Sequence, residues 1–179
     1  IALDGSEKTV CMTRGNGRSS QVSYRILYSN MDKEVFGADE KVYVLGVHYK
    51  DMSQSICQID MKGNVRTLMH GDYMYNIKAF SESHKYCLWV RQNVSTFPDL
   101  CHSTANFTNI KRVTDANPQQ KEYVWGSVKI VEWKNYEGKQ NRGLLYLPEG
   151  YDSKQTYPVI VQFYETHTEE KNHYIMPLL

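Results

Sequence analysis

The stretch KVYVLGVHYK (residues 41–50), followed at residues 54–60 by QSICQID, gives the clearest indication of how this chain folds. Both runs are rich in β-branched, aromatic and other apolar residues, and a polar turn precedes the lysine that opens the first, as expected of a bounded β-strand. The same arrangement recurs downstream, where KYCLWVRQ begins at Lys85 and PDLCHST begins 13 residues later at Pro98. The sequence therefore predicts a repeated pair of strands.

A third copy of this pair lies upstream, where KTVCMTR begins at Lys8 and QVSYRIL begins 13 residues later at Gln21. The two later copies also continue alike, with NVRTLMHGD from Asn64 and NIKRVTDAN from Asn109. The lysines at positions 8, 41 and 85 put the copies 33 and 44 residues apart. Such periods indicate a β-propeller or a similar β-repeat, and since a propeller has about 4–8 blades, three units predict an incomplete one. A plain antiparallel sandwich with fortuitously similar hairpins is the alternative.

The composition is that of a globular domain, with 41% hydrophobic and 23% charged residues in a chain of 179. Its net charge of +1 argues against a nucleic-acid-binding surface, which needs a basic excess. No apolar run reaches the roughly 18 residues that a membrane-spanning helix needs. The first residues, IALDG, carry no readable targeting signal.

The cysteines are predicted to be buried free thiols in strands, because free cysteine behaves as a small hydrophobic residue. They contain no C-x-x-C pair, which argues against a zinc site, while one disulfide stays open if the protein is exported. The four are Cys11, Cys57, Cys87 and Cys101.

No metal or cofactor is expected in this chain. The run HTEEKNH (residues 167–173) has two histidines and two glutamates but is not H-E-x-x-H, so it is interpreted as an exposed polar loop. Its Glu169-Glu170 doublet is interpreted as a solvated surface pair.

The pattern changes after residue 120. The run VTDANPQQKEYVWG (residues 113–126) contains the turn former Asn-Pro and then a polar stretch, which is typical of a boundary. Beyond it, residues 127–134 and 142–147 flank the turn YEGKQ and are predicted to pair as a hairpin. The apolar run YPVIVQFY (residues 157–164) then favours a strand covered on both faces, as in a parallel α/β sheet.

The run WGSVKIVEWKNYEGKQNRGLLYLPEGYDSKQTYPVIVQFYE (residues 125–165) resembles the entry to the catalytic domain of serine peptidases of the prolyl oligopeptidase family. It looks most like the dipeptidyl-peptidase-IV-like branch of Bacteroidetes-type bacteria. Residues 80–119 are similar to a late propeller blade of that branch, in which Phe-Pro-Asp-Leu (97–100) precedes a Thr-Asx-Asn-Pro-like turn (114–118). The resemblance covers nearly the whole chain and is strongest over about residues 80–175.

The resemblance implies a mainly β chain in which the last blades of a β-propeller (residues 1–120) join the first strands of an α/β-hydrolase domain (residues 121–179). The family's serine lies in a Gly-x-Ser-x-Gly elbow and acts with an aspartate and a histidine. This sequence has no such elbow, since Ser127 in WGSVK follows a glycine but lacks the second one. We therefore expect a fragment, inactive by itself, of a serine exopeptidase that releases N-terminal dipeptides or tripeptides. A peptide substrate, association between copies, and a periplasmic or exported location follow from the resemblance.

One functional position of the family falls within the chain. Tyr164, just after the apolar run, matches a tyrosine that helps to form the oxyanion hole in the dipeptidyl-peptidase-IV-like branch. The ending here is YET rather than the YAG-like ending of other members, so the match rests on position. The alternative is a tyrosine that packs its ring at the end of a strand and exposes its hydroxyl.

A hypothesis of another class is a self-contained, non-catalytic β-rich binding module. It accounts for the missing triad without any further sequence. It does not account for an apolar strand of the parallel type with no helix to cover it.

Overall fold

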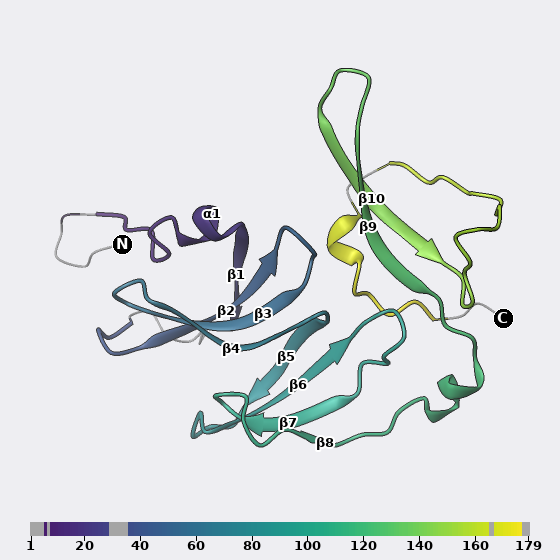
Figure 1. The fold of residues 1–179 in the computed structure, drawn as a ribbon. Helices are drawn as coiled ribbons and strands as arrows, with labels where there is room; N and C mark the ends of the chain where they lie inside the picture. The colour runs from purple at the N-terminus through teal and green to yellow at the C-terminus, as the bar shows by residue number, and fades with distance from the viewer. Residues whose placement is uncertain (1–5, 7, 29–35, 165–166, 177–179) are drawn as a thin grey trace.

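The computed structural model describes residue 6 and residues 8–28, 36–164 and 167–176. Within them the chain is mainly β, with three antiparallel sheets, one five-residue α-helix and two short 3₁₀ helices (Figure 1). No helix in these ranges is both long and apolar enough to cross a membrane.

Each of the two larger sheets is a four-stranded antiparallel meander whose strands follow one another in chain order. The first sheet consists of β1 (Val22–Tyr28), β2 (Lys41–His48), β3 (Gln54–Asp60) and β4 (Val65–Gly71). The second consists of β5 (Met74–Phe80), β6 (Tyr86–Gln92), β7 (Leu100–Thr104) and β8 (Lys111–Arg112).

The two later copies of the sequence repeat occupy equivalent places in the two sheets. Lys41 opens β2 and Lys85 directly precedes β6, which are the second strands of their sheets. Gln54 opens β3 and Pro98 shortly precedes β7, which are the third strands. The predicted strand pairs are therefore confirmed for these copies, and the 44-residue spacing runs from one sheet to the next.

The first copy is confirmed only in its second half, since QVSYRIL forms most of β1 whereas KTVCMTR forms no strand. Residues 8–15 form no strand, because successive turns satisfy their backbone groups: Arg14 N donates to Cys11 O at 3.1 Å, and Asn16 N donates to Thr13 O at 2.8 Å. Helix α1 (Asn16–Ser20) then follows. Gln21 precedes β1, a first strand, so this copy is out of phase with the sheets.

The main core lies between the two sheets. Trp89 in β6 is fully buried, and its indole N–H donates to Ser103 Oγ at 3.0 Å. The ring centroids of Tyr75 and Phe107 lie 6.2 and 5.9 Å from that of Trp89, which are separations typical of interacting aromatic pairs. The buried members of this cluster are Ile56, Tyr75, Cys87, Trp89, Cys101 and Phe107.

A second cluster covers the other face of the first sheet. Met12, from the turns before α1, packs there with Tyr24, Met61 and Val65 against the buried residues Val42, Val44, Cys57 and Ile59. Six successive residues of β3, Gln54–Ile59, are consequently buried. The first sheet is thus sandwiched, which explains why β3 lacks the alternation of a half-exposed strand.

The predicted hairpin after the boundary is confirmed. β9 (Ser127–Lys134) pairs with β10 (Gln140–Leu147). In the turn between these strands, the Asn135 side chain accepts hydrogen bonds from the backbone N–H groups of Glu137 and Lys139 at 3.0 and 2.9 Å. No residue of the two strands is buried, and Figure 1 shows the hairpin projecting away from the two larger sheets. The 3₁₀ helix η1 (Pro118–Glu122) lies on the path to it.

The prediction of a buried strand at residues 157–164 is wrong for this structure. The segment forms no strand, and Ile160 and Phe163 are 97% and 87% exposed. A β-strand exists only beside a partner that pairs its backbone groups. The described residues supply no partner here, and they contain no parallel pair of strands, so the α/β part of the expected fold is not observed.

The cysteines are free thiols, as predicted, but they differ in burial. Cys57, Cys87 and Cys101 are buried in β3, β6 and β7, and burial raises the pKa of the Cys87 and Cys101 thiols. Cys11 is exposed in the N-terminal turns, which corrects the prediction for that residue.

Candidate functional site

Tyr164, the candidate oxyanion donor, lies at the end of the exposed apolar segment, and its side chain is 88% exposed. A group that stabilises an oxyanion has to be fixed in place before the reaction begins. The exposed segment provides no such fixation, so the catalytic role of Tyr164 stays a prediction.

Residues 168–174 form hydrogen bonds with loops about 100 or more residues earlier in the sequence. Thr168–Tyr174, here called the strap, begins with the 3₁₀ helix η2 (Thr168–Glu170). In Figure 1 it is the yellow segment between the β9–β10 hairpin and the two larger sheets. Its exposure is selective. The buried strap residues are Thr168, Lys171, Asn172 and Tyr174, whereas Glu169, Glu170 and His173 are exposed.

Lys171 is the most unusual strap residue, because lysine is almost never buried unless it is paired. Its side chain is only 10% exposed. The ammonium donates to Asp72 Oδ1 at 2.7 Å and to the backbone carbonyl of Asp51 at 3.0 Å. These two acceptors come from the β4–β5 turn and the β2–β3 turn, so one cation joins two loops.

Asn172 forms hydrogen bonds with the same two loops. Its amide nitrogen donates to Asp72 Oδ1 at 2.9 Å and to the carbonyl of Met52 at 3.4 Å. Met52 is 4% exposed and has a φ of +57°, a backbone conformation that non-glycine residues seldom adopt. The turn thus presents two successive carbonyls, those of Asp51 and Met52, toward the strap.

Tyr174 occupies an aromatic position at the other end of the strap. Its ring centroid lies 5.2 Å from that of Phe97, edge-on, and 5.2 Å from that of Trp125. Its hydroxyl accepts from the Asn117 side chain at 3.1 Å, and its backbone N–H donates to Gln92 Oε1 at 3.3 Å. Burial raises the pKa of Tyr174, and the hydrogen bond from Asn117 opposes that rise.

The hairpin contacts the same β2–β3 turn. The Arg142 guanidinium lies over the Tyr49 ring, 3.6 Å from its centroid, and donates to the Tyr49 carbonyl and to Met52 Sδ. A cation over an aromatic face is attracted by the ring quadrupole. The turn is therefore held from two sides, by β10 and by the strap.

The predicted exposed loop at residues 167–173 is correct only in part. Glu169 pairs with Arg25 at 2.6 Å and Glu170 with His167 at 3.1 Å, and all four side chains are at least 45% exposed. Such exposed pairs contribute about 0–1 kcal/mol each. Sequence reasoning missed the buried residues between them, because a lysine in a polar run gives no signal of burial. Nowhere in the described ranges do three or more His, Cys, Asp or Glu side chains form a group that could hold a metal.

Two serine–histidine pairs lie at the same end of the first sheet. Ser53 Oγ is 2.9 Å from His70 Nε2, and Ser55 Oγ is 3.1 Å from His48 Nε2. A nucleophile must reach its substrate, yet Ser53 and Ser55 are 4% and 2% exposed. These pairs satisfy buried hydroxyls and are not a catalytic site.

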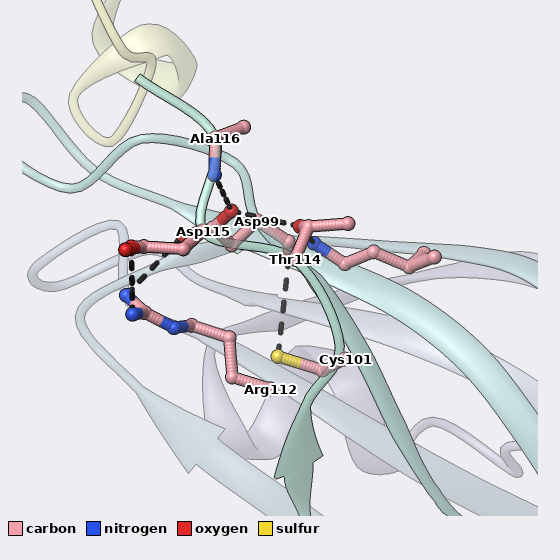
Figure 2. Close-up of polar contacts among 7 residues, drawn as sticks. Asp99, Cys101, Arg112, Thr114, Asp115 and Ala116 are labelled. Atoms are coloured by element: carbon pink, nitrogen blue, oxygen red, sulfur yellow. Dashed lines mark hydrogen bonds and ion pairs between the residues drawn. The ribbon is translucent and has the colours of Figure 1, made fainter. Parts of the chain in front are cut away.

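A carboxylate links the two motifs noted within the blade-like run at residues 80–119. Asp99, from the Phe-Pro-Asp-Leu stretch, accepts from Thr114 Oγ1 and from the Ala116 backbone N–H, both at 2.8 Å (Figure 2). Arg112 lies 3.4 Å from Asp99 and 2.7 Å from Asp115. This Asp99 clasp fixes the chain between the second sheet and η1, next to Asn117, which contacts the strap.

An apolar cavity of about 330 Å³ lies beyond the Tyr174 position. It lies between the open end of the β9–β10 hairpin, the β6–β7 loop and the end of the described chain. Its lining residues are Val94, Trp125, Gly126, Ser127, Tyr146, Leu147, Pro148 and Ile175.

Comparison with known proteins gives partial structural likenesses but no sequence match. No family model and no curated protein matches the sequence. Among solved structures, the chain is similar to a variant of AtxE2 isopeptidase with Astexin3-dC4 bound. The TM-score is 0.47 at 9% identity, over 82% of this chain and 27% of the isopeptidase chain. This chain therefore spans about a quarter of the length of that protein.

Proposed function

We propose that this chain is part of a serine peptidase of the prolyl oligopeptidase type. In this proposal the two four-stranded sheets are neighbouring blades of a β-propeller, and residues 121–179 begin the catalytic domain. The supporting observation is the succession of two antiparallel meanders that carry one 44-residue repeat at equivalent strand positions. Successive four-stranded meanders that bury their faces against each other are how propellers are built.

The exposed apolar segment is a second support. Val159, Ile160 and Val161 are 72%, 97% and 75% exposed, although their β-branched side chains favour a packed strand. In the proposed enzyme, this segment joins a parallel sheet formed with residues outside the 179. Tyr164 would then be held at the end of a paired strand, where a phenol hydroxyl could face the developing oxyanion.

The chemistry in this proposal is acyl transfer through a serine. The nucleophile, base and acid would be contributed by residues outside the 179, since the sequence has no Gly-x-Ser-x-Gly elbow. The family resemblance makes N-terminal dipeptides or tripeptides the proposed products. The blades would restrict entry to the active site, so that short peptides are preferred.

Hydrolysis assays test this proposal. The full gene product that contains this chain should release p-nitroaniline from a dipeptidyl or tripeptidyl nitroanilide with a free amine, and acylating that amine should abolish the reaction. The 179-residue chain, purified in parallel, should release none. A full gene product that is folded but inert toward both substrates would contradict the proposal.

A self-contained binding module is the second candidate, and one observation favours it. The strap contacts the loops of the first sheet through the buried Lys171 and Asn172, and the hairpin contacts them through the half-buried Arg142, which gives the described residues internal contacts of their own. A monomer with a single cooperative unfolding transition would support this candidate. Association through the exposed apolar segment would support the peptidase fragment.

A further inference from the structure

We propose that the strap is an intramolecular ligand, and that the surface beneath it is a recognition site for peptides. The preferred peptide carries a cation, a side-chain amide and an aromatic ring at positions i, i+1 and i+3, as Lys171, Asn172 and Tyr174 do. The surface, here called the strap seat, consists of Asp51, Met52, Asp72, Gln92, Phe97 and Trp125. The inference does not depend on peptidase activity.

The first part of the strap seat selects donors. The three oxygens that face Lys171 and Asn172 are Asp72 Oδ1 and the carbonyl oxygens of Asp51 and Met52. An ionised carboxylate and a backbone carbonyl accept hydrogen bonds and cannot donate them. An anion would be repelled here, whereas an ammonium followed by an amide NH₂ supplies enough donors. The chemistry therefore specifies a basic residue and then an amide.

The second part selects an aromatic ring and a peptide backbone. Phe97 and Trp125 both lie 5.2 Å from the Tyr174 ring, in edge-on and tilted arrangements favoured by aromatic pairs. Gln92 Oε1 accepts the backbone N–H of Tyr174 rather than a side-chain group. This contact requires a main-chain donor at the aromatic residue, which makes the ligand a peptide.

The strands and loops of the two larger sheets carry every residue of the seat except Trp125, and the apolar clusters of these sheets form without the strap. Both apolar clusters are made of residues from 12 to 107, and no strap residue belongs to either. Between the buried anchors, Glu169, Glu170 and His173 face solvent, so only a few side chains hold the strap in place. A segment held by separate anchors on a finished surface can leave and be replaced by another peptide.

Peptide binding in trans tests the inference. The probe is a fluorescently labelled peptide with the sequence of residues 167–176, HTEEKNHYIM. The Lys171→Ala/Asn172→Ala chain, in which the strap has lost two anchors, should bind this peptide about tenfold or more tightly than the unmodified chain does. Replacing the peptide's lysine with norleucine should weaken binding to the altered chain by about tenfold, because a charge-assisted hydrogen bond is lost.

A carboxylate in the seat supplies the matched control. Adding Asp72→Asn to the altered chain should weaken peptide binding by about tenfold, while Asp39→Asn, at an exposed carboxylate outside the seat, should leave it unchanged. Equal binding by the unmodified and altered chains, or binding that ignores Asp72→Asn, would overturn the inference.

Amide hydrogen exchange on the unmodified chain gives a second, independent measurement. A strap that leaves its seat should exchange the Tyr174 amide far faster than the amides of β3 and β6, because local opening is easier than global unfolding. Exchange of the strap only together with the core strands would show that it is an integral part of the fold, and would overturn the inference even if the altered chains did not fold.

Discussion

At the scale of single residues, Trp89 is the side chain on which the main core depends most directly. It is 0% exposed and its indole N–H is paired with Ser103. Trp89→Ala should lower the free energy of unfolding by about 3–5 kcal/mol, through lost burial and a residual cavity. Urea unfolding measures this, with Trp133→Ala as the control because Trp133 is 48% exposed. Similar losses for both variants would contradict the position of the core.

His48 gives a prediction about pH. Burial and the neighbouring His70 lower the pKa of His48 from 6.5, although Asp51 opposes the shift. The unfolded state therefore binds more protons than the folded state below about pH 6.5, and stability should fall as pH falls through that region. Unfolding at pH 7.5 and pH 5 should show a smaller loss for His48→Gln than for the unmodified chain.

His173→Gln is the matched control for this pH dependence, because the His173 side chain is exposed. This variant should lose as much stability between pH 7.5 and pH 5 as the unmodified chain does. An unchanged loss in His48→Gln would show that other groups cause the pH dependence.

At the scale of elements, the Asp99 clasp links the second sheet to the chain that follows it. The Asp99 side chain is 13% exposed, and its removal would leave the Thr114 hydroxyl and the Ala116 N–H without their acceptor. Asp99→Ala should lower the free energy of unfolding by about 1–3 kcal/mol. Asp115→Ala, at a carboxylate that is 58% exposed, should lower it by less than about 1 kcal/mol. Equal losses of unfolding free energy for Asp99→Ala and Asp115→Ala, measured by urea unfolding, would contradict the stabilising role of the Asp99 clasp.

Strands that carry the repeat could be predicted from the sequence, because their apolar and β-branched runs are bounded by turns. The runs at residues 8–14 and 157–164 show the limit of that reasoning. Both have strand-like composition, yet local turn bonds satisfy the first, and the second has no partner strand among the described residues. Composition reports what a segment favours, whereas pairing depends on which neighbour the fold brings to it.

The strap seat could not be predicted at all. Lys171 is 99 residues from Asp72 and 120 residues from Asp51, and no local periodicity reports a contact between such distant positions. Its sequence run, HTEEKNH, has the polarity of an exposed loop. Only the folded structure distinguishes the buried cation from the exposed carboxylates beside it.

At the scale of the whole molecule, the apolar segment at residues 159–164 should cause copies to associate. An exposed apolar segment of high β-propensity invites pairing with another chain. Each of the following residues is at least 72% exposed: Val159, Ile160, Val161, Phe163 and Tyr164. Sedimentation should show concentration-dependent oligomers that are reduced by Ile160→Lys/Phe163→Lys. Val124→Lys, at a 76% exposed valine outside the segment, should leave them unchanged. A strictly monomeric unmodified chain would count against the peptidase fragment.

Locating the reactive serine would test the claim that the chain belongs to a serine peptidase. The full gene product should be treated with a fluorophosphonate probe, and the modified peptide identified by mass spectrometry. We predict a single adduct on a serine in a Gly-x-Ser-x-Gly sequence outside these 179 residues, and no adduct on the 179-residue chain. An adduct on Ser53, Ser55 or any other serine of this chain, or no adduct on a folded full-length protein, would contradict the claim.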